Sequence, residues 1–187
     1  ISYNIKSKKT RQLYLETSDT YVSMPKLVRF HSDNSFIINS EKDGFNHLYH
    51  YDKDGNLIKQ ITSGNFEVAE IYGVDESSNT IYYQSNESNE IESCIYSINY
   101  KTLEKTKLNT QNGTNNAVFS TDFSYFLQTY SSSEIPPQIS IVQTKNLAAT
   151  SIEKNQSLQD SLKNIPQKKF FKILVKNDSL NAWFIEP

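Results

Sequence analysis

The chain has 187 residues, of which 36% are hydrophobic, and carries a net charge of −2. This length suits one or two domains, and the near-neutral charge argues against a nucleic-acid-binding protein, which would need a basic patch. The single cysteine, Cys94, excludes an internal disulfide and any cysteine-based zinc site, and we expect it to be a small buried residue. No apolar run reaches the roughly 18 residues of a membrane span.

Short segments that alternate apolar and polar residues follow one another along the chain and predict β-strands. They are rich in Ile, Tyr, Phe and Val and are bounded by Asp, Asn, Gly or Ser. In chain order they are "RQLYLE", "SFIINS", "NHLYHYD", "NLIKQIT", "TIYYQS", "SCIYSINY" and "SYFLQTY". The stretch "KDGN", Lys53–Asn56, predicts a tight hairpin turn of type I′, because Asp-Gly tolerates its positive φ angles.

One helix is predicted, at Ser157–Ile165 near the C-terminal end. Leu158, Leu162 and Ile165 fall on one helical face, and Pro166 would end the helix.

A repeat of about 45 residues organises the predicted strands. Phe36, Ile81 and Phe126 each open a strand after a polar turn, and a second strand follows about a dozen residues later. Four short strands per repeat are typical of a β-propeller blade, whereas a β-sandwich with evenly spaced strands is the alternative. We therefore expect an all-β partial propeller of about three to four blades, each a four-stranded antiparallel sheet, with one short helix.

The expected domain is a single propeller segment over residues 1–187, with blade-like repeats at about 30–73, 74–118 and 119–180. Three such units do not close a ring, because propellers typically have four to eight blades. The start at Ile1 and the final "WFIEP" also suggest a piece of a longer protein.

No catalytic, cofactor-binding or metal-binding residue is predicted. A serine hydrolase would need a Gly-x-Ser-x-Gly elbow, which the sequence lacks. The histidines are His31, His47 and His50, and the last two lie in a predicted strand. Because they are three residues apart, they would point to opposite faces and would not share a metal ion. We expect one to be buried and hydrogen-bonded and the other to face solvent.

The acidic run "SNESNEIES" contains Glu87, Glu90 and Glu92 and is expected to be a solvated loop, with a cation or calcium site as the alternative. Asn-x-Ser/Thr sequences begin at four positions, which chance explains in a chain so rich in Asn and Ser. They are Asn86, Asn112, Asn155 and Asn177.

Several strings resemble the propeller of the dipeptidyl peptidase IV family, within the prolyl oligopeptidase group of serine peptidases. The longest is "SEKDGFNHLYHYDKDGNLIKQITSGNFEVAEIYGVDE", Ser40–Glu76. "FSTDFSYFLQTYSSSEIPPQISI" at Phe119–Ile141 is similar to the next blade, and "SDTYV" at Ser18–Val22 resembles the family's Ser-Asp-Thr-Trp-Val. The final "LNAWFIEP" resembles the strand by which the family's chain leaves the propeller for the hydrolase domain, so the resemblance implies that the hydrolase domain is absent from these 187 residues.

The resemblance implies the last three or so of eight blades in an exported protein, periplasmic or at the cell surface, that removes dipeptides from peptide N termini. The family's catalytic serine, aspartate and histidine would lie beyond Pro187, and nothing here matches its paired glutamates. Arg29 aligns poorly with a substrate-facing arginine of some members, so no role is transferred to it.

The expected function is that of a non-catalytic propeller segment, which walls the active-site chamber and gates the access of peptides. Its expected partners are the parent's own hydrolase domain, the parent's peptide substrates and a second copy in a homodimer. The alternative is a stand-alone protein- or glycan-binding module at the cell surface, with Tyr72, Tyr82 and Tyr130 as an exposed aromatic platform.

Overall fold

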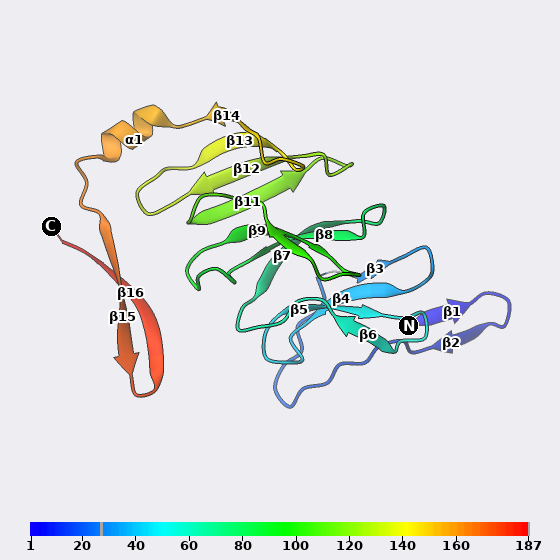
Figure 1. Cartoon of the computed structure of the whole chain (residues 1–187). Coiled ribbons are helices and arrows are strands. Elements are labelled where there is room, and N and C mark those ends of the chain that lie inside the picture. Colours follow the sequence, from blue (N-terminus) through cyan, green and yellow to red (C-terminus); the bar gives the residue numbers. More distant parts are fainter. Residues whose placement is uncertain (27, 187) are drawn as a thin grey trace. The chain divides into compact units, whose positions relative to one another are not determined.

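The computed structural model describes residues 1–26 and 28–186 (Figure 1). Its strands form three four-stranded sheets and two two-stranded hairpins. The first sheet contains β3 (Val28–Phe30), β4 (Phe36–Ser40), β5 (His47–Tyr51) and β6 (Leu57–Gln60). The second contains β7 (Val68–Asp75), β8 (Thr80–Ser85), β9 (Cys94–Asn99) and β10 (Lys105–Lys107). The third contains β11 (Thr114–Phe119), β12 (Tyr125–Ser131), β13 (Gln138–Gln143) and β14 (Ala149–Glu153).

The strands of each four-stranded sheet lie side by side in chain order, and the pairs with a defined register are antiparallel. The hairpins are β1 (Ser2–Asn4) with β2 (Lys9–Arg11), and β15 (Lys168–Val175) with β16 (Asp178–Ile185). The predicted class, an all-β partial propeller of four-stranded antiparallel sheets with one short helix, is confirmed. The single-domain assignment and the limits of the repeats stay predictions; the second sheet itself begins at Val68.

The three residues that defined the 45-residue spacing occupy matching positions in the three sheets. Phe36, Ile81 and Phe126 lie at or next to the start of the second strand, and their exposed fractions are 2%, 0% and 1%. The prediction that they are equivalent and buried is confirmed. Each repeat of about 45 residues therefore forms one four-stranded sheet.

An aspartate orders the turn that precedes the second strand in each sheet. The side-chain oxygens of Asp33, Asp75 and Asp122 accept hydrogen bonds from serine backbone N–H groups two residues further along. Asn34 and Asn79 in two of these turns have φ values of 65° and 57°, which asparagine tolerates better than most residues. Short polar turns thus set the start of each central strand.

Both faces of β4 and β5 are buried in the first sheet. One face carries Phe36, Ile38, Tyr49 and Tyr51, which pack with Leu13 from the N-terminal segment. The other face carries residues that alternate with these, including buried Ile37, Leu48 and His50. A central strand of this sheet is therefore covered on both sides.

The helix α1 (Gln156–Leu162) is shorter than predicted and buries no residue. Leu158 and Ile165 are exposed, and Ile165 lies beyond the helix end. The predicted Leu158–Leu162–Ile165 face is thus not a packed stripe. An apolar spacing of i, i+4, i+7 gives helical phase but does not guarantee a surface to pack against.

The turn at 53–56 is not the predicted type I′, because Gly55 has a φ of 86° whereas Asp54 keeps a negative φ. Asp52 organises this turn by accepting hydrogen bonds from the N–H groups of Asp54 and Asn56, both at 2.8 Å. The β5–β6 register shifts next to it, between His50 and Tyr51. The turn therefore has one left-handed residue and a bulge.

The chain divides into two compact units. The first contains Ile1–Glu87 and Tyr96–Thr106, and so the N-terminal hairpin, the first sheet and most of the second. The second contains Ser88–Ile95 and Lys107–Pro187, and so the third sheet, α1 and the C-terminal hairpin. Each unit contains buried residues of its own, such as Ile37 in the first and Phe126 in the second.

Candidate functional site

Two of the three histidines meet in the first unit, together with a tyrosine from the second sheet. The ring centroids of His31 and His50 are 5.6 Å apart, and Tyr100 lies 5.0 Å from His31 and 5.5 Å from His50. His31 follows β3, His50 belongs to β5, and Tyr100 follows β9. These three rings together with Ser35 are called the histidine pocket below.

The turn between β3 and β4 fixes two members of the pocket. The His31 N–H donates to the Ser35 carbonyl at 2.8 Å, and the Asn34 N–H donates to the His31 carbonyl at 3.0 Å. Asp33 Oδ1 accepts the Ser35 N–H at 2.9 Å. The sequence "HSDNS" therefore closes a turn that directs His31 and Ser35 towards His50.

The pair of Ser35 and His50 resembles a nucleophile with its base, because Ser35 Oγ and His50 Nε2 share a hydrogen bond of 3.0 Å. In a catalytic triad an acidic side chain would hold the other imidazole nitrogen. Asp33 instead accepts the backbone N–H of Ser35, and that N–H is thereby unavailable to an oxyanion. Ser35 is also buried. The pair is therefore best read as a structural hydrogen bond.

His31 is the unusual member of the pocket. Its side chain is only 6% exposed, yet within the described residues neither ring nitrogen has a hydrogen-bond partner. The Nδ1 atom lies 3.9 Å from Glu76 Oε1, too far for a hydrogen bond. The ring lines a hollow of about 180 Å³, whose walls also include Ser35, His50, Tyr100 and Lys101. This hollow has room for water beside the unpaired nitrogens.

Burial is the main influence on ionisation in the pocket. It lowers the pKa of His31 below its ordinary value, although the nearby carboxylates of Glu76 and Asp33 act in the opposite direction. Burial also lowers the pKa of His50, and the neighbouring positive charge of a protonated His31 would lower it further. Burial raises the pKa of Tyr100. The rings are therefore held as neutral groups near neutral pH.

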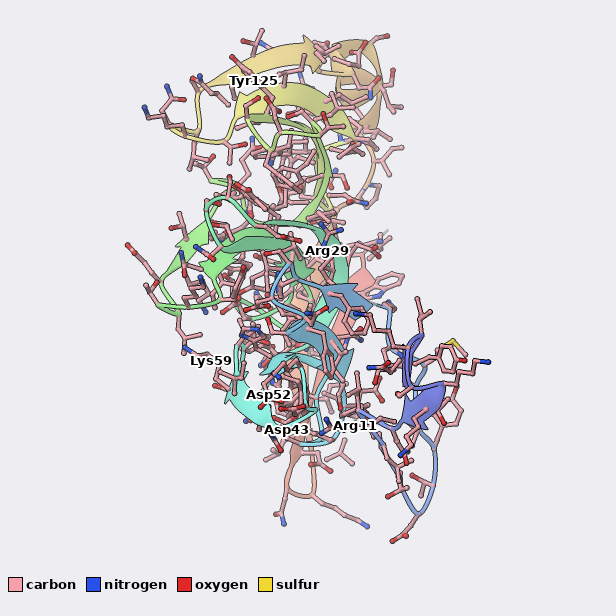
Figure 2. All side chains as sticks on the ribbon, turned by 90° about the vertical axis from the view of Figure 1, so that its right-hand side faces the viewer. Arg11, Arg29, Asp43, Asp52, Lys59 and Tyr125 are labelled. Atoms are coloured by element: carbon pink, nitrogen blue, oxygen red, sulfur yellow. The ribbon has the colours of Figure 1, made fainter. Side chains whose placement is uncertain are left out.

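Charged residues at the rim connect the first sheet to the second. Arg29, labelled in Figure 2, donates to Glu76 Oε1 from Nε at 3.2 Å and from Nη2 at 3.0 Å. Lys59, also labelled there, donates to the Lys101 carbonyl at 2.7 Å. Arg29, which had no predicted role, thus belongs to an ion pair on the surface of the first unit.

The structure corrects the prediction for the "HLYH" pair. His47 and His50 do point to opposite faces of β5, but both are buried, so neither faces solvent. His47 shares hydrogen bonds with Thr62 Oγ1 at 3.1 Å and with the Gly64 carbonyl at 2.9 Å. The prediction failed because alternation along one strand does not reveal that a second layer covers the outer face.

The acidic run is only partly a solvated loop. Glu90 is exposed and pairs with Lys172. Glu87 instead is largely buried, where it accepts hydrogen bonds from Tyr83 and Ser85 at 3.0 Å and pairs with Lys105. The position of Glu87, two residues after the end of the predicted strand that contains Ser85, could have indicated that its side chain folds back onto the sheet.

The prediction of an exposed aromatic platform formed by Tyr72, Tyr82 and Tyr130 is also wrong. Tyr82 and Tyr130 are buried, and Tyr72 is half-buried. The Tyr130 hydroxyl donates to the Asn112 carbonyl at 3.1 Å. These tyrosines therefore belong to the packing of their sheets.

Within residues 1–26 and 28–186, no group of three or more His, Cys, Asp or Glu side chains suits a metal ion. In the same part of the chain, no helix has the length and apolar character to cross a membrane. The single cysteine, Cys94, is free and buried, as predicted.

The sequence model of the dipeptidyl peptidase IV (DPP IV) N-terminal region matches residues 1–137. The chain belongs to this family. Its sheets of four consecutive antiparallel strands agree with the propeller that the sequence patterns predicted. The match covers the first two sheets and the first two strands of the third, β11 and β12.

Curated relatives carry the name dipeptidyl peptidase 4. The chain is 30% identical over 172 residues to the Arthroderma otae protein, covering 88% of this chain and 22% of the relative. It is 28% identical over 173 residues to the Trichophyton rubrum protein, covering 88% of this chain and 22% of that relative. The chain therefore spans about a fifth of the length of these relatives.

Two solved structures resemble the chain. The crystal structure of Porphyromonas gingivalis dipeptidyl peptidase 4 matches with a TM-score of 0.77 and 39% identity, covering 86% of this chain and 23% of that one. A structure from Bacteroides ovatus matches with a TM-score of 0.67 at 19% identity, covering 86% of this chain and 26% of that one. The second likeness shows the fold alone.

Proposed function

We propose that this chain is a non-catalytic propeller segment of a serine-type dipeptidyl peptidase. The observation that carries the proposal is the match of residues 1–137 to the DPP IV N-terminal region. Relatives named dipeptidyl peptidase 4, about four times as long, support it, because they leave ample length for a separate hydrolase domain. In this proposal the parent removes dipeptides from peptide N termini and is exported.

The proposed role of the segment is to wall the chamber in front of the active site and to restrict entry to unstructured peptides. Sheets with central strands buried on both faces, such as β4 and β5, are suited to this because they resist local opening. Selectivity would then depend on access to the chamber. Its partners would be the parent's hydrolase domain and the peptides that pass through.

The catalytic half of the proposal has a direct test. We expect the purified 187-residue chain not to hydrolyse a chromogenic dipeptide with proline at its second position, because in the hydrogen-bonded pair of Ser35 and His50 the nearby Asp33 accepts the Ser35 backbone N–H, which is then unavailable to an oxyanion. Turnover that a serine-directed inhibitor abolishes, and that the Ser35→Ala variant lacks, would overturn it.

The gating half needs the full-length parent. Three substrates with the same N-terminal dipeptide are compared: a chromogenic dipeptide, an unstructured peptide and a folded protein. We expect kcat/KM for the folded protein to be lower by a factor of about 100 or more than for the unstructured peptide, since unfolding a domain costs several kcal/mol. Equal values for these two would contradict a chamber wall.

A further inference from the structure

The contact between the first and second sheets has a polar rim and a titratable interior. At the rim, Lys26 Nζ donates to the Ala69 carbonyl at 3.0 Å, alongside the contacts of Arg29 and Lys59 described above. Inside this rim, the rings of His31 and His50 pack on Tyr100. The interior is thus held by aromatic packing around imidazoles that are neutral near pH 7.

We propose that the histidine pocket is an acid-sensitive latch. Protonation of His31 and His50 weakens the contact between the first sheet and the turn at residues 99–104 of the second sheet.

Protons can reach the pocket while the chain is folded. The hollow beside His31 has space for water, and the ring nitrogens of His31 are not occupied by hydrogen bonds within the described residues. The imidazoles therefore need no global unfolding to titrate.

The charges that face the pocket come from every element around it. Glu76 at the end of β7 and Asp33 in the β3–β4 turn stabilise a protonated His31. Arg29 and Lys101 oppose it. For His50, Asp33 is favourable, whereas a protonated His31, Lys59 and Lys101 are unfavourable.

Burial and like charges together outweigh the two carboxylates. Two protonated rings 5.6 Å apart in a mostly buried site repel one another. Opening the contact would let both rings be hydrated and move apart. The closed contact is therefore weaker when the rings carry charge.

The direction of the pH effect follows from the lowered pKa values of His31 and His50. In the opened contact both rings regain the ordinary histidine pKa of about 6.5. The opened form consequently binds more protons than the closed form below that value. The contact is fully formed above about pH 6.5 and weakens as the pH falls towards the lowered pKa of the closed form.

The turn at 99–104 is the element that gives way, because most of its hydrogen bonds close within the turn itself, such as those from the Leu103 N–H to the Asn99 carbonyl and from the Asn99 N–H to the Glu104 carbonyl. The Tyr100 N–H donates to the Asn79 carbonyl at 2.9 Å, and the Asn99 side-chain amide donates to the Ser78 carbonyl at 3.0 Å. Residues 101–104 are exposed. Weakly packed turns open at lower free energy than the sheets that carry them.

Hydrogen exchange of the full 187-residue chain tests the latch, with rates corrected for the intrinsic effect of pH. Between pH 7 and pH 5 we expect protection of the Tyr100 and Leu103 amides to fall by up to about tenfold per pH unit for each proton taken up on opening. In the His31→Gln/His50→Gln variant this response should disappear. An unchanged response in that variant would overturn the proposal.

The Arg29–Glu76 pair provides matched variants. Arg29→Gln and Glu76→Gln break the same ion pair, so a purely structural effect would be similar in both. The latch predicts opposite changes, because Arg29 lowers the pKa of His31 and Glu76 raises it. Arg29→Gln should weaken the acid response and Glu76→Gln should strengthen it; equal changes would overturn the latch.

A measurement on the unmodified chain covers the case in which a variant fails to fold. NMR titration of the imidazole C–H signals should give pKa values for His31 and His50 below about 6.5. Values at or above this would remove the basis of the latch.

Discussion

The first sheet and the C-terminal hairpin use similar residues in opposite ways. Every residue of β4 and β5 is buried, whereas β15 and β16 are exposed along almost their whole length. The hairpin is no more polar, for "FFKILV" and "AWFI" are as apolar as "FIINS" and "HLYHY". Burial therefore depends on what stacks on each face of a strand and not on the composition of the strand itself.

One face of the hairpin is especially apolar. In the β15–β16 register Phe171 lies opposite Ala182, and Ile173 lies opposite Leu180. Phe171 and Phe184 pack edge to face, with ring centroids 5.6 Å apart. An apolar face of this kind tends to be buried against another surface, since large exposed apolar patches are uncommon on soluble monomers.

Truncating a phenylalanine in a packed sheet, and another in the hairpin, gives the largest expected contrast. Phe36→Ala or Phe126→Ala should lower the free energy of unfolding by about 3–5 kcal/mol, because each leaves a cavity in a packed sheet. Phe170→Ala, at a half-exposed position of β15, should change it by about 0.5 kcal/mol or less. Urea denaturation followed by circular dichroism measures all three. A cost for Phe170→Ala similar to that for Phe36→Ala would show that the hairpin is covered.

A pair of glycine variants measures how closely the N-terminal segment packs on the first sheet. Both Gly55 and Gly44 have positive φ, so alanine at either position should cost about 1–2 kcal/mol in backbone strain. A Cβ on Gly55 would also lie 2.1 Å from the Leu13 carbonyl oxygen, whereas one on Gly44 meets nothing within 4 Å.

Gly55→Ala should therefore be less stable than Gly44→Ala by about a further 1–3 kcal/mol, the usual cost of overpacking. Thermal and urea denaturation of the two variants would give this difference. Equal losses would mean that residues near Leu13 move away at little cost.

Self-association is the prediction for the exposed hairpin. We expect two copies to pair through the face that carries Ile173, most simply about a two-fold axis. Ile173→Lys should prevent pairing, whereas Leu174→Lys, on the opposite face, should leave it intact. Sedimentation at micromolar concentration distinguishes these cases. A clean 21.5 kDa species that binds no hydrophobic dye would show that the face needs no cover.

The smallest expected effect concerns a turn of the third sheet. Hydrogen bonds from Ser120 and Ser124 lower the pKa of Asp122 to about 2. This carboxylate therefore supports the turn above its ordinary pKa, and its contribution is lost as the pH falls from about 4 towards 2. Ser124→Ala should move the Asp122 pKa back towards its ordinary value in an NMR titration. No movement would assign the shift to other groups.

The fold was largely predictable from the sequence because its signals are local. Polar turns at regular spacing and short alternating strands located Phe36, Ile81 and Phe126 in equivalent places. Asp33, Asp75 and Asp122 supply the turn chemistry within a few residues of each strand. Sequence-local features of this kind can be read without knowing which sheets become neighbours.

The candidate site was not predictable in the same way. His31, His50 and Tyr100 come from three different strands or turns, and no regular spacing along the chain predicts that their rings are in contact. The buried outer face of β5 was missed for the same reason. Glu87 was misread because a carboxylate beside a buried tyrosine looks, in sequence, like any charge in a loop.

The spacing of the polar contacts in the first unit has a consequence for how the chain reaches its fold. Arg11 with Asp54, Lys26 with Ala69, Arg29 with Glu76 and Lys59 with Lys101 join residues 43, 43, 47 and 42 positions apart. Each link thus closes a loop of about one repeat and never one of the whole chain. Because closure entropy grows with loop length, the first unit can fold in the order of its synthesis, with the second sheet docking on the first once that sheet is complete.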